Sequence, residues 1–227
     1  MKEAETLMKQ YDGMLQRTSR LQQGYQSSLS IAMSPLLVDS IFPSILRKYT
    51  EDERNTELSI TVAESSDMQQ LIEDSEVDVA LSCTPSNSKH IQTTLLSEES
   101  ITLVTAHDGW DSESGPVVEA LELLSTHVIF TDHHPTMWPT LKRQVKMHAK
   151  ASRFAKVSQS YAAKRFILEG MGVSFLPFFA VSREIQEGRM ITVETPFMEL
   201  PKIDLYALHP IHEAKSEVFV EFVKGYL

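Results

Sequence analysis

The chain has 227 residues, a formal net charge of −10 at pH 7, 42% hydrophobic residues and 23% charged residues. This length suffices for one large domain or two small ones, each with its own hydrophobic core. A domain that binds DNA by itself carries a basic surface, so the acidic balance argues against nucleic acid as a direct partner. The lone cysteine, Cys83, excludes an internal disulfide and a thiolate metal cluster, and we interpret it as a buried thiol.

The first 26 residues differ from the rest of the chain. Apolar residues recur there at spacings of three, four and seven, which predicts an amphipathic helix: Ala4, Leu7, Met8, Tyr11, Met14, Leu15 and Leu21. A linker or pairing helix and a frayed N-terminus both fit this segment. It has no uninterrupted apolar stretch of the kind a secretory signal needs, and no run in the chain approaches the roughly 18 apolar residues of a membrane helix. We therefore expect a cytoplasmic protein without membrane contact.

From Leu29 onward, short apolar runs alternate with amphipathic stretches. The predicted strands are Leu29–Met33, Leu58–Ala63, Val77–Leu81, Ile101–Ala106, Val128–Phe130, Phe154–Val157, Val173–Leu176, Met190–Val193 and Ile203–Leu208. The predicted helices are Pro35–Tyr49, Asp67–Asp74, Pro116–Ser125, Trp138–Lys150, Tyr161–Gly170, Phe179–Gln186 and Ala214–Tyr226. Repeated strand–helix–strand units indicate an α/β fold with mostly parallel sheets and helices on both faces. So many strands in a chain of this length favour two lobes.

The ends of several predicted strands carry hydroxyl or amide side chains where a helix begins. These ends are Met33-Ser34, Ser65-Ser66, Thr131 and Gln159-Ser160. In open α/β sheets, ligands bind at the carboxyl ends of strands, and the unpaired N–H groups of helix N-termini favour anions. Each residue taken singly is more simply a helix cap. Four such ends together predict a pocket for a carboxylate or another anion.

No pattern points to catalysis or to a metal. The sequence lacks a Gly-x-Ser-x-Gly elbow, a phosphate-binding glycine loop and a His-Glu-x-x-His motif. Adjacent histidines on an extended segment point to opposite faces, so His133 and His134 make a poor pair of metal ligands. We interpret His134 as a pocket residue that can meet an anionic ligand. We expect a protein that is not an enzyme and uses no cofactor or metal.

Several segments, in order, resemble the effector-binding domain of LysR-type transcriptional regulators. They are the strand at 28–32, the helix at 41–49, the Glu64-Ser65-Ser66 turn, the Val77–Leu81 strand and the block at 167–177. The sequence departs from the family pattern where both glycines of the first strand and the glycine of the turn are replaced. The resemblance covers nearly the whole chain and rests on the order and spacing of the segments.

The resemblance implies a two-lobed fold like that of type II periplasmic binding proteins. Residues 27–101 with 203–227 would form lobe I and residues 102–202 lobe II, with Ile101–Ala106 and Ile203–Leu208 as the strands that cross between them. Residues 1–26 would be the remnant of a linker helix from an N-terminal winged helix-turn-helix, which this chain does not contain. DNA contact would then occur only through that missing module.

The family's ligand site, carried over by position, lies in the cleft between the lobes. It comprises Ser34, Ser65, Ser66, Thr131, His134, Gln159, Ser160 and, as an apolar wall, Phe175. The resemblance implies a small-molecule effector and assembly into a homodimer or tetramer. We expect the dimer to form through the helices Pro35–Tyr49 and Ala214–Tyr226 or their neighbours. A solute-binding protein of a transporter and a bilobal enzyme, such as one like prephenate dehydratase, are the alternatives.

Overall fold

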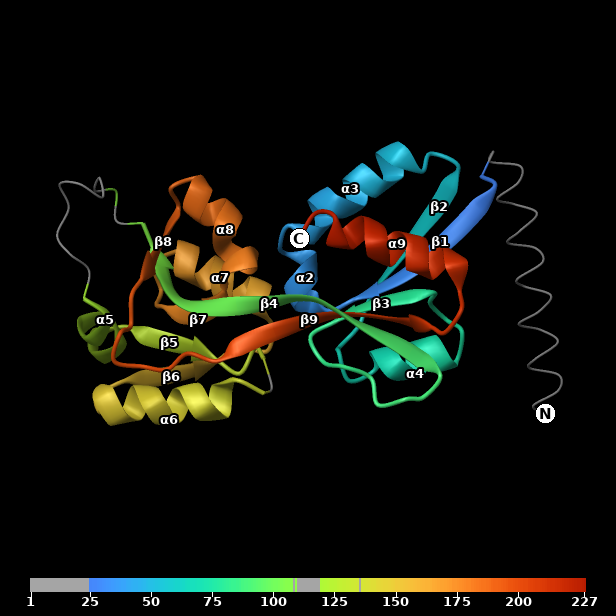
Figure 1. Cartoon of the computed structure of the whole chain (residues 1–227). Coiled ribbons are helices and arrows are strands. Elements are labelled where there is room, and N and C mark those ends of the chain that lie inside the picture. Colours follow the sequence, from blue (N-terminus) through green and yellow to red (C-terminus); the bar gives the residue numbers. More distant parts are fainter. Residues whose placement is uncertain (1–24, 108, 110–118, 135) are drawn as a thin grey trace.

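The computed structural model describes residues 25–107, 109, 119–134 and 136–227. These residues form two halves that lie side by side, connected by two long strands, β4 (Ile91–Ala106) and β9 (Lys202–Pro210) (Figure 1). The predicted two-lobed α/β architecture with two crossover strands is confirmed. The proposed lobe boundaries, 27–101 with 203–227 and 102–202, stay a prediction, and most of the proposed linker helix lies outside the described residues.

The first half contains the N-terminal strands and the C-terminal helix. Its elements are β1 (Ser27–Met33), α2 (Pro35–Val38), α3 (Phe42–Asp52), β2 (Thr56–Val62), α4 (Met68–Glu73), β3 (Val79–Ser82) and α9 (Ala214–Lys224). Strand β1 pairs in parallel with β2 and with β3, and β9 pairs with β3 in the antiparallel sense. The described part of this half is therefore a mixed sheet whose parallel strands all end at the same edge.

The second half is built around the continuation of β4. Its elements are α5 (Ala120–Thr126), β5 (Val128–Thr131), α6 (Trp138–His148), β6 (Arg153–Lys156), α7 (Ser160–Leu168), β7 (Ser174–Pro177), α8 (Phe178–Gln186) and β8 (Met190–Val193). Strands β7 and β8 both pair antiparallel with β4, and β5 pairs in parallel with β6. Strand β4 thus contributes to the sheets of both halves.

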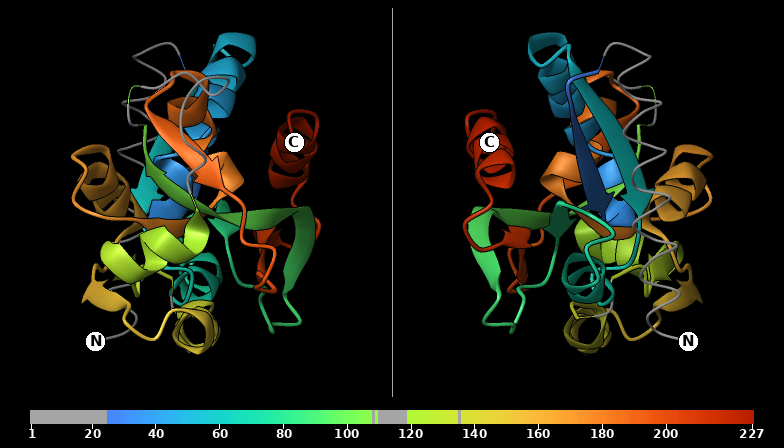
Figure 2. Two further views of the ribbon diagram at one scale, coloured as in Figure 1. Left: turned by 90° about the vertical axis from the view of Figure 1, so that its left-hand side faces the viewer. Right: turned by 90° about the vertical axis from the view of Figure 1, so that its right-hand side faces the viewer.

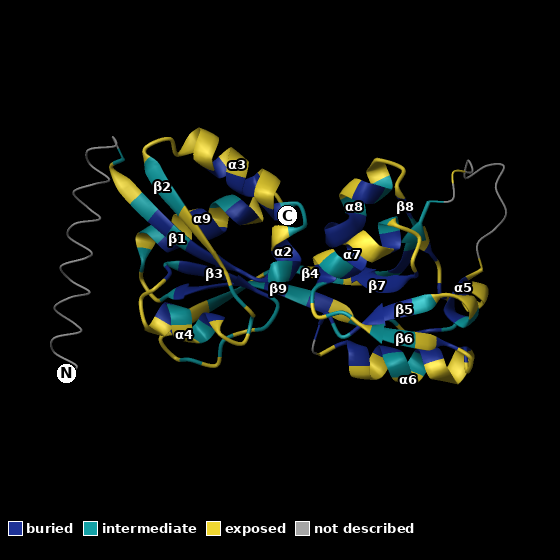
Figure 3. Ribbon diagram, turned by 180° about the vertical axis from the view of Figure 1, so that it is seen from behind, coloured by how far each residue is buried: buried dark blue, intermediate teal, exposed yellow. Residues whose placement is uncertain are grey.

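Helices cover both faces of each sheet because successive side chains of a strand point to opposite faces. Ile31 and Met33 of β1 belong to the core that packs under α3 and α9, whereas Ala32 between them packs with α4. In Figures 1 and 2, α3 and α9 accordingly lie on one side of the strands and α4 on the other. In Figure 3, β3 and β7 are buried along their whole length, whereas β2 and β6 are intermediate to exposed. The burial of apolar side chains supplies the main favourable free energy of the fold.

The prediction of a single helix over Pro35–Tyr49 is wrong. It divides into α2 and α3, with a turn between Val38 and Phe42. Pro43 has no N–H to donate to the carbonyl four residues earlier, which belongs to Asp39, so a continuous helix would lose that bond. The hydroxyl of Ser40 closes the turn by donating to the Leu37 carbonyl at 2.6 Å and accepting from the Phe42 N–H at 3.3 Å.

Strand β4 is ten residues longer than the sequence predicts. The additional part, 91–100, contains Glu98 and Glu99, a charged pair of the kind more common in exposed loops. There β4 pairs with β9, placing Glu98 opposite Asp204 and Ser100 opposite Lys202. Exposed strand positions accept charged side chains, so the polar composition concealed the strand.

Candidate functional site

A pocket lies between the two halves, at the carboxyl ends of five strands. Twelve described residues line it: Ser34, Pro35, Leu36, Glu64, Ser65, Ser66, Cys83, Thr84, His133, His134, Gln159 and Ser160. They follow β1, β2 and β3 in the first half and β5 and β6 in the second. The pocket has a volume of about 150 Å³, which is room for on the order of ten water molecules. It suits a small metabolite.

The first wall of the pocket is a network of hydroxyls around Cys83. The Ser65 hydroxyl accepts the Cys83 N–H at 3.1 Å, and the Thr84 hydroxyl donates to the Ser65 carbonyl at 3.4 Å. The Ser34 hydroxyl lies 3.7 Å from the Cys83 sulfur. Burial raises the pKa of the Cys83 thiol to about 11, so this sulfur is a neutral thiol rather than a nucleophilic thiolate.

The second wall contains the two histidines, which are both nearly buried. Burial is the main reason that the pKa of His133 falls to about 3, and it also lowers the pKa of His134. The Ser174 hydroxyl donates to the Phe130 carbonyl at 2.7 Å, so it must accept its 2.9 Å bond from Nε2–H of His133. His133 is therefore a neutral imidazole in a fixed tautomer. Both walls present neutral polar groups.

Two side chains connect the walls at the rim of the pocket. The Gln159 amide of the second half donates to the Glu64 carboxylate of the first at 3.0 Å. Glu64 is exposed, and of the described lining residues it alone carries a full charge at neutral pH. Each half contributes one partner to this bond, so its formation depends on how the halves are placed.

Helices α2 and α7 begin at the pocket without side-chain caps. Their N-cap residues, Ser34 and Gln159, are in the extended conformation and make no capping hydrogen bond. The prediction that Ser34 caps its helix with its hydroxyl is wrong, and Ser160 is the first residue of α7 rather than its cap. The first N–H groups of a helix have no partner within it, so at α7 they are available to a ligand.

The structure brings six of the eight predicted site residues together. Ser34, Ser65, Ser66, His134, Gln159 and Ser160 line the pocket, whereas Thr131 and Phe175 do not. Thr131 is fully buried, with its hydroxyl directed to the Ala155 carbonyl at 3.4 Å. Phe175 is fully buried in the core, where its ring lies 6.2 Å from that of Trp138.

The turn after β5 explains the place of Thr131. Asp132 adopts a positive φ of 70°, a conformation that favours glycine, asparagine and aspartate, and its carboxylate pairs with Lys142 at 2.5 Å. The chain therefore bends immediately after Thr131, and His133 and His134 both line the pocket. The prediction for the two histidines assumed an extended segment, whereas the chain turns at Asp132.

Sequence reasoning missed six lining residues: Pro35, Leu36, Glu64, Cys83, Thr84 and His133. Cys83 and Thr84 directly follow β3, so the rule that selected the other strand ends could have found them. Within the described residues, no three His, Cys, Asp or Glu side chains are placed to hold a metal ion together. None of the described helices is long and apolar enough to span a membrane.

Comparisons with known proteins show the family of this chain. A model of the LysR substrate-binding domain matches residues 22–227. The HTH-type transcriptional regulator CitR of Bacillus subtilis is 34% identical over 220 residues, which cover 97% of this chain and 75% of that protein. The chain belongs to the LysR substrate-binding domain family. It is the effector-binding domain of a LysR-type transcriptional regulator, as the sequence resemblance predicted.

Solved structures show the same LysR fold at low sequence identity. Full-length CbnR, in complex with its target DNA, matches with a TM-score of 0.69 at 15% identity, covering 100% of this chain and 79% of that one. The bromide-bound regulatory domain of HypT from Salmonella typhimurium matches with a TM-score of 0.66 at 18% identity, covering 88% of this chain and 97% of that one. These likenesses establish the fold and leave the ligand open.

Proposed function

We propose that the pocket between the two halves binds a small-molecule effector that carries a carboxylate or another anionic group. The observation that carries this proposal is the convergence of five strand ends, three from one half and two from the other, on one small pocket. A ligand held there contacts both halves, so its binding free energy depends on their relative placement.

The chemistry of the lining supports an anionic group of low charge. Hydroxyls of Ser34 and Ser160 and the uncapped start of α7 offer hydrogen-bond donors and a partial positive charge. Among the described lining residues there is no lysine or arginine, and Glu64 opposes further negative charge at the rim. A monocarboxylate with a polar or apolar remainder fits this lining better than a ligand with several charges.

The effector acts by shifting an equilibrium between arrangements of the protein. A ligand can do so only by the difference in its affinity for the two arrangements. We propose that the shift reaches DNA through an N-terminal helix-turn-helix domain of the whole regulator, which acts in the cytoplasm. The neutral Cys83 thiol supports binding without covalent chemistry.

We also propose that the domain pairs with a second copy through α3, α9 or their neighbours. The rings of Phe219 and Phe222 on α9 pack 5.0 and 5.1 Å from the ring of Tyr49 on α3, so these side chains are used inside the domain. Val218 of α9 and Tyr226, which follows the end of that helix, remain 60% and 47% exposed. They are apolar side chains that a partner would cover.

Thermal unfolding against acetate, succinate, glutamate and benzoate tests the effector proposal. A ligand at a hundred times its dissociation constant stabilises the folded state by about 2.7 kcal/mol, which raises the Tm of a domain of this size by about 5–10 °C. We expect a selective rise with one chemical class.

A matched pair of serine variants then locates the site. Ser34→Ala removes a pocket hydroxyl and should weaken binding of the stabilising acid about two- to tenfold, the value of one hydrogen bond. Ser182→Ala removes a hydroxyl of α8 that bonds the Phe179 carbonyl, away from the pocket lining, and should leave affinity unchanged. Equal affinities in both variants and the wild type would contradict the site.

A further inference from the structure

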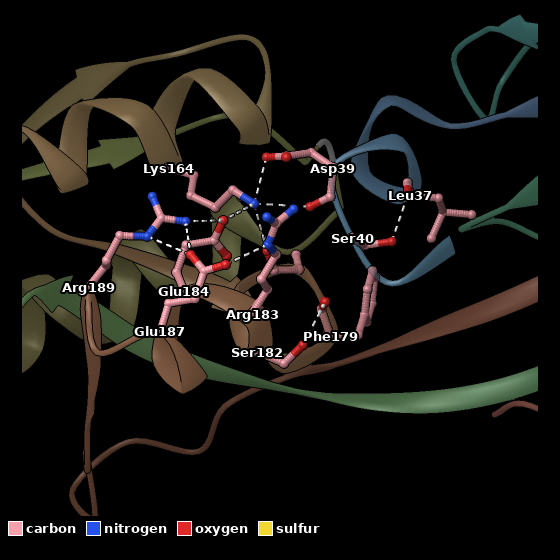
Figure 4. Close-up of polar contacts among 11 residues, drawn as sticks. Leu37, Asp39, Ser40, Lys164, Phe179, Ser182, Arg183, Glu184, Glu187 and Arg189 are labelled. Atoms are coloured by element: carbon pink, nitrogen blue, oxygen red, sulfur yellow. Dashed lines mark hydrogen bonds and ion pairs between the residues drawn. The ribbon is translucent and has the colours of Figure 1, made fainter. Parts of the chain in front are cut away.

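Helices α2 and α7, which come from different halves, meet a second time beyond the pocket, at Lys164 (Figure 4). The Lys164 side chain is only 9% exposed. Its Nζ atom lies 2.7 Å from Oδ2 of Asp39, 3.0 Å from Oε1 of Glu184 and 3.1 Å from the carbonyls of both Asp39 and Ala180. Four oxygen atoms therefore surround a buried ammonium group.

Each half contributes two of these four contacts. Glu184 and Ala180 belong to α8, in the same half as Lys164, and the Glu184 side chain is 8% exposed. Asp39 ends α2 in the other half, and its side chain is 41% exposed. If the halves moved apart, the Lys164–Glu184 pair would stay intact within its own half. Only the contacts to Asp39 would break.

The Asp39 carbonyl is available to Lys164 because of the local sequence. In a continuous helix this oxygen would accept the N–H of residue 43, but residue 43 is proline and has none. The same residue that divides α2 from α3 thus leaves a free acceptor at the end of α2. Lys164 uses that acceptor together with the Asp39 carboxylate.

The contact lies on two helices whose N-terminal ends line the pocket. Ser34 precedes α2 and Asp39 follows it, whereas Ser160 begins α7 and Lys164 lies one turn later. A change in the distance between Lys164 and Asp39 therefore changes the distance between the Ser34 and Ser160 ends of the same helices.

We propose that Lys164 is a positioning residue. It is paired with Glu184 in its own half, binds Asp39 of the other half, and so sets the distance between the two pocket walls. Its effect on effector affinity rests on the function proposed above, but its effect on the placement of the halves does not. Neighbouring charges are already engaged: Arg183 pairs with Glu187 at 2.8 Å, and Arg189 with Glu187 at 2.6 Å. Arg189 also lies 3.7 Å from Glu184.

The proposal can be tested on the ligand-free chain by measuring the distance between spin labels on the two halves. Glu73→Cys on α4 and Met147→Cys on α6 provide exposed labelling positions in different halves. Cys83 is half-buried and lines the pocket, so all variants carry Cys83→Ser and the labels go only to the introduced cysteines. Asp39→Ala removes the gripped carboxylate and leaves the buried Lys164–Glu184 pair in place.

We expect the label-to-label distance distribution of Asp39→Ala to shift and broaden relative to the background without that substitution. Glu169→Gln removes the carboxylate that follows the end of α7 and pairs with Arg165 of that helix, and it should leave the distribution unchanged. A shift of similar size in this control would overturn the proposal, because charge alone would then explain the effect.

A second variant, Lys164→Met with Glu184→Leu, removes the ammonium and its buried partner together. A shift of the distance distribution in this variant, with none in Asp39→Ala, would show that Lys164 acts through its hydrogen bond to the Asp39 carbonyl. Unchanged distributions in both would overturn the proposal whatever the ligand-binding experiments show. If the double variant proves unfolded by circular dichroism, a shift in Asp39→Ala still supports the proposal, and an unchanged distribution in it overturns the role of the Asp39 carboxylate.

Discussion

Helices α2 and α7 face each other in two regions that differ in chemistry. At their N-terminal ends they are separated by a pocket lined by hydroxyls, neutral imidazoles and one exposed carboxylate. One turn further along, they are joined by a buried ammonium with oxygen atoms from both halves around it. The same pair of helices thus leaves room for a ligand at one end and is connected by ion pairs at the other.

The difference shows how a domain can combine a fixed contact with a variable one. A buried ammonium requires partners in every state of the protein, so Lys164 keeps Glu184 close at all times. Neutral hydroxyls can hydrogen-bond to water when no ligand is bound and to the ligand when it is. The charged region should therefore govern stability and placement, and the neutral region should govern affinity.

The largest expected effect is the loss of the buried carboxylate in Glu184→Leu. Removing one partner of a buried ion pair costs about 3–5 kcal/mol, and we expect the lower end of this range because the Asp39 carboxylate remains 2.7 Å from Nζ of Lys164. Urea unfolding should show this fall in the free energy of unfolding, whereas Glu187→Gln, at an exposed carboxylate of the same region, should change it far less because exposed ion pairs contribute little. Equal effects would mean that Glu184 is not the essential partner of Lys164.

The next effect concerns His133 and pH. Its folded pKa of about 3 lies below the ordinary 6.5, so the unfolded chain binds the proton more tightly and stability falls as the pH drops from about 6.5 toward 3. Between pH 7 and pH 5 this contribution amounts to about 2 kcal/mol. The dependence of the free energy of unfolding on pH should become weaker in His133→Gln. It should persist in His127→Gln, which alters an exposed histidine. Urea unfolding at both pH values measures it, and an unchanged slope in His133→Gln would contradict the assignment.

The smallest effect lies at the rim of the pocket. Glu64→Gln removes the carboxylate that opposes an anionic ligand and keeps a side chain able to bond Gln159. Affinity for the carboxylate that stabilises the wild type should rise about two- to fivefold, because an exposed charge interaction is worth up to about 1 kcal/mol. Calorimetric titration at low and high salt should show the gain shrinking with salt. A loss of affinity would mean that Glu64 binds the ligand directly.

Much of the fold could be predicted from sequence because the hydrophobic periodicity carries it. All nine predicted strands lie within or overlap strands of the structure. Strands such as β3 and β7 are buried along their whole length, whereas β2 and β6 contain no buried residue. The part of β4 before Ile101 was missed because a partly exposed strand tolerates Glu98 and Glu99. Pro43 indicates the break between α2 and α3, but the spacing of the apolar residues on both sides of the break suggested one helix.

The site was predictable where it depends on topology and unpredictable where it depends on a single backbone angle. The rule that ligands bind at strand carboxyl ends found Ser34, Ser65 and Ser160. The positive φ at Asp132 decides that His133 rather than Thr131 lines the pocket, and no periodicity encodes that angle. Contacts between segments distant in the chain, such as Lys164 with Asp39, also leave no local signal.

Hydrogen–deuterium exchange with and without the stabilising carboxylate tests the central claim most directly, namely that one ligand contacts both halves in this pocket. We predict slower exchange at the start of α7 and in the turn after β5 on one side, and in the turns after β2 and β3 on the other. Protection confined to one half, or located away from the five strand ends, would contradict the account.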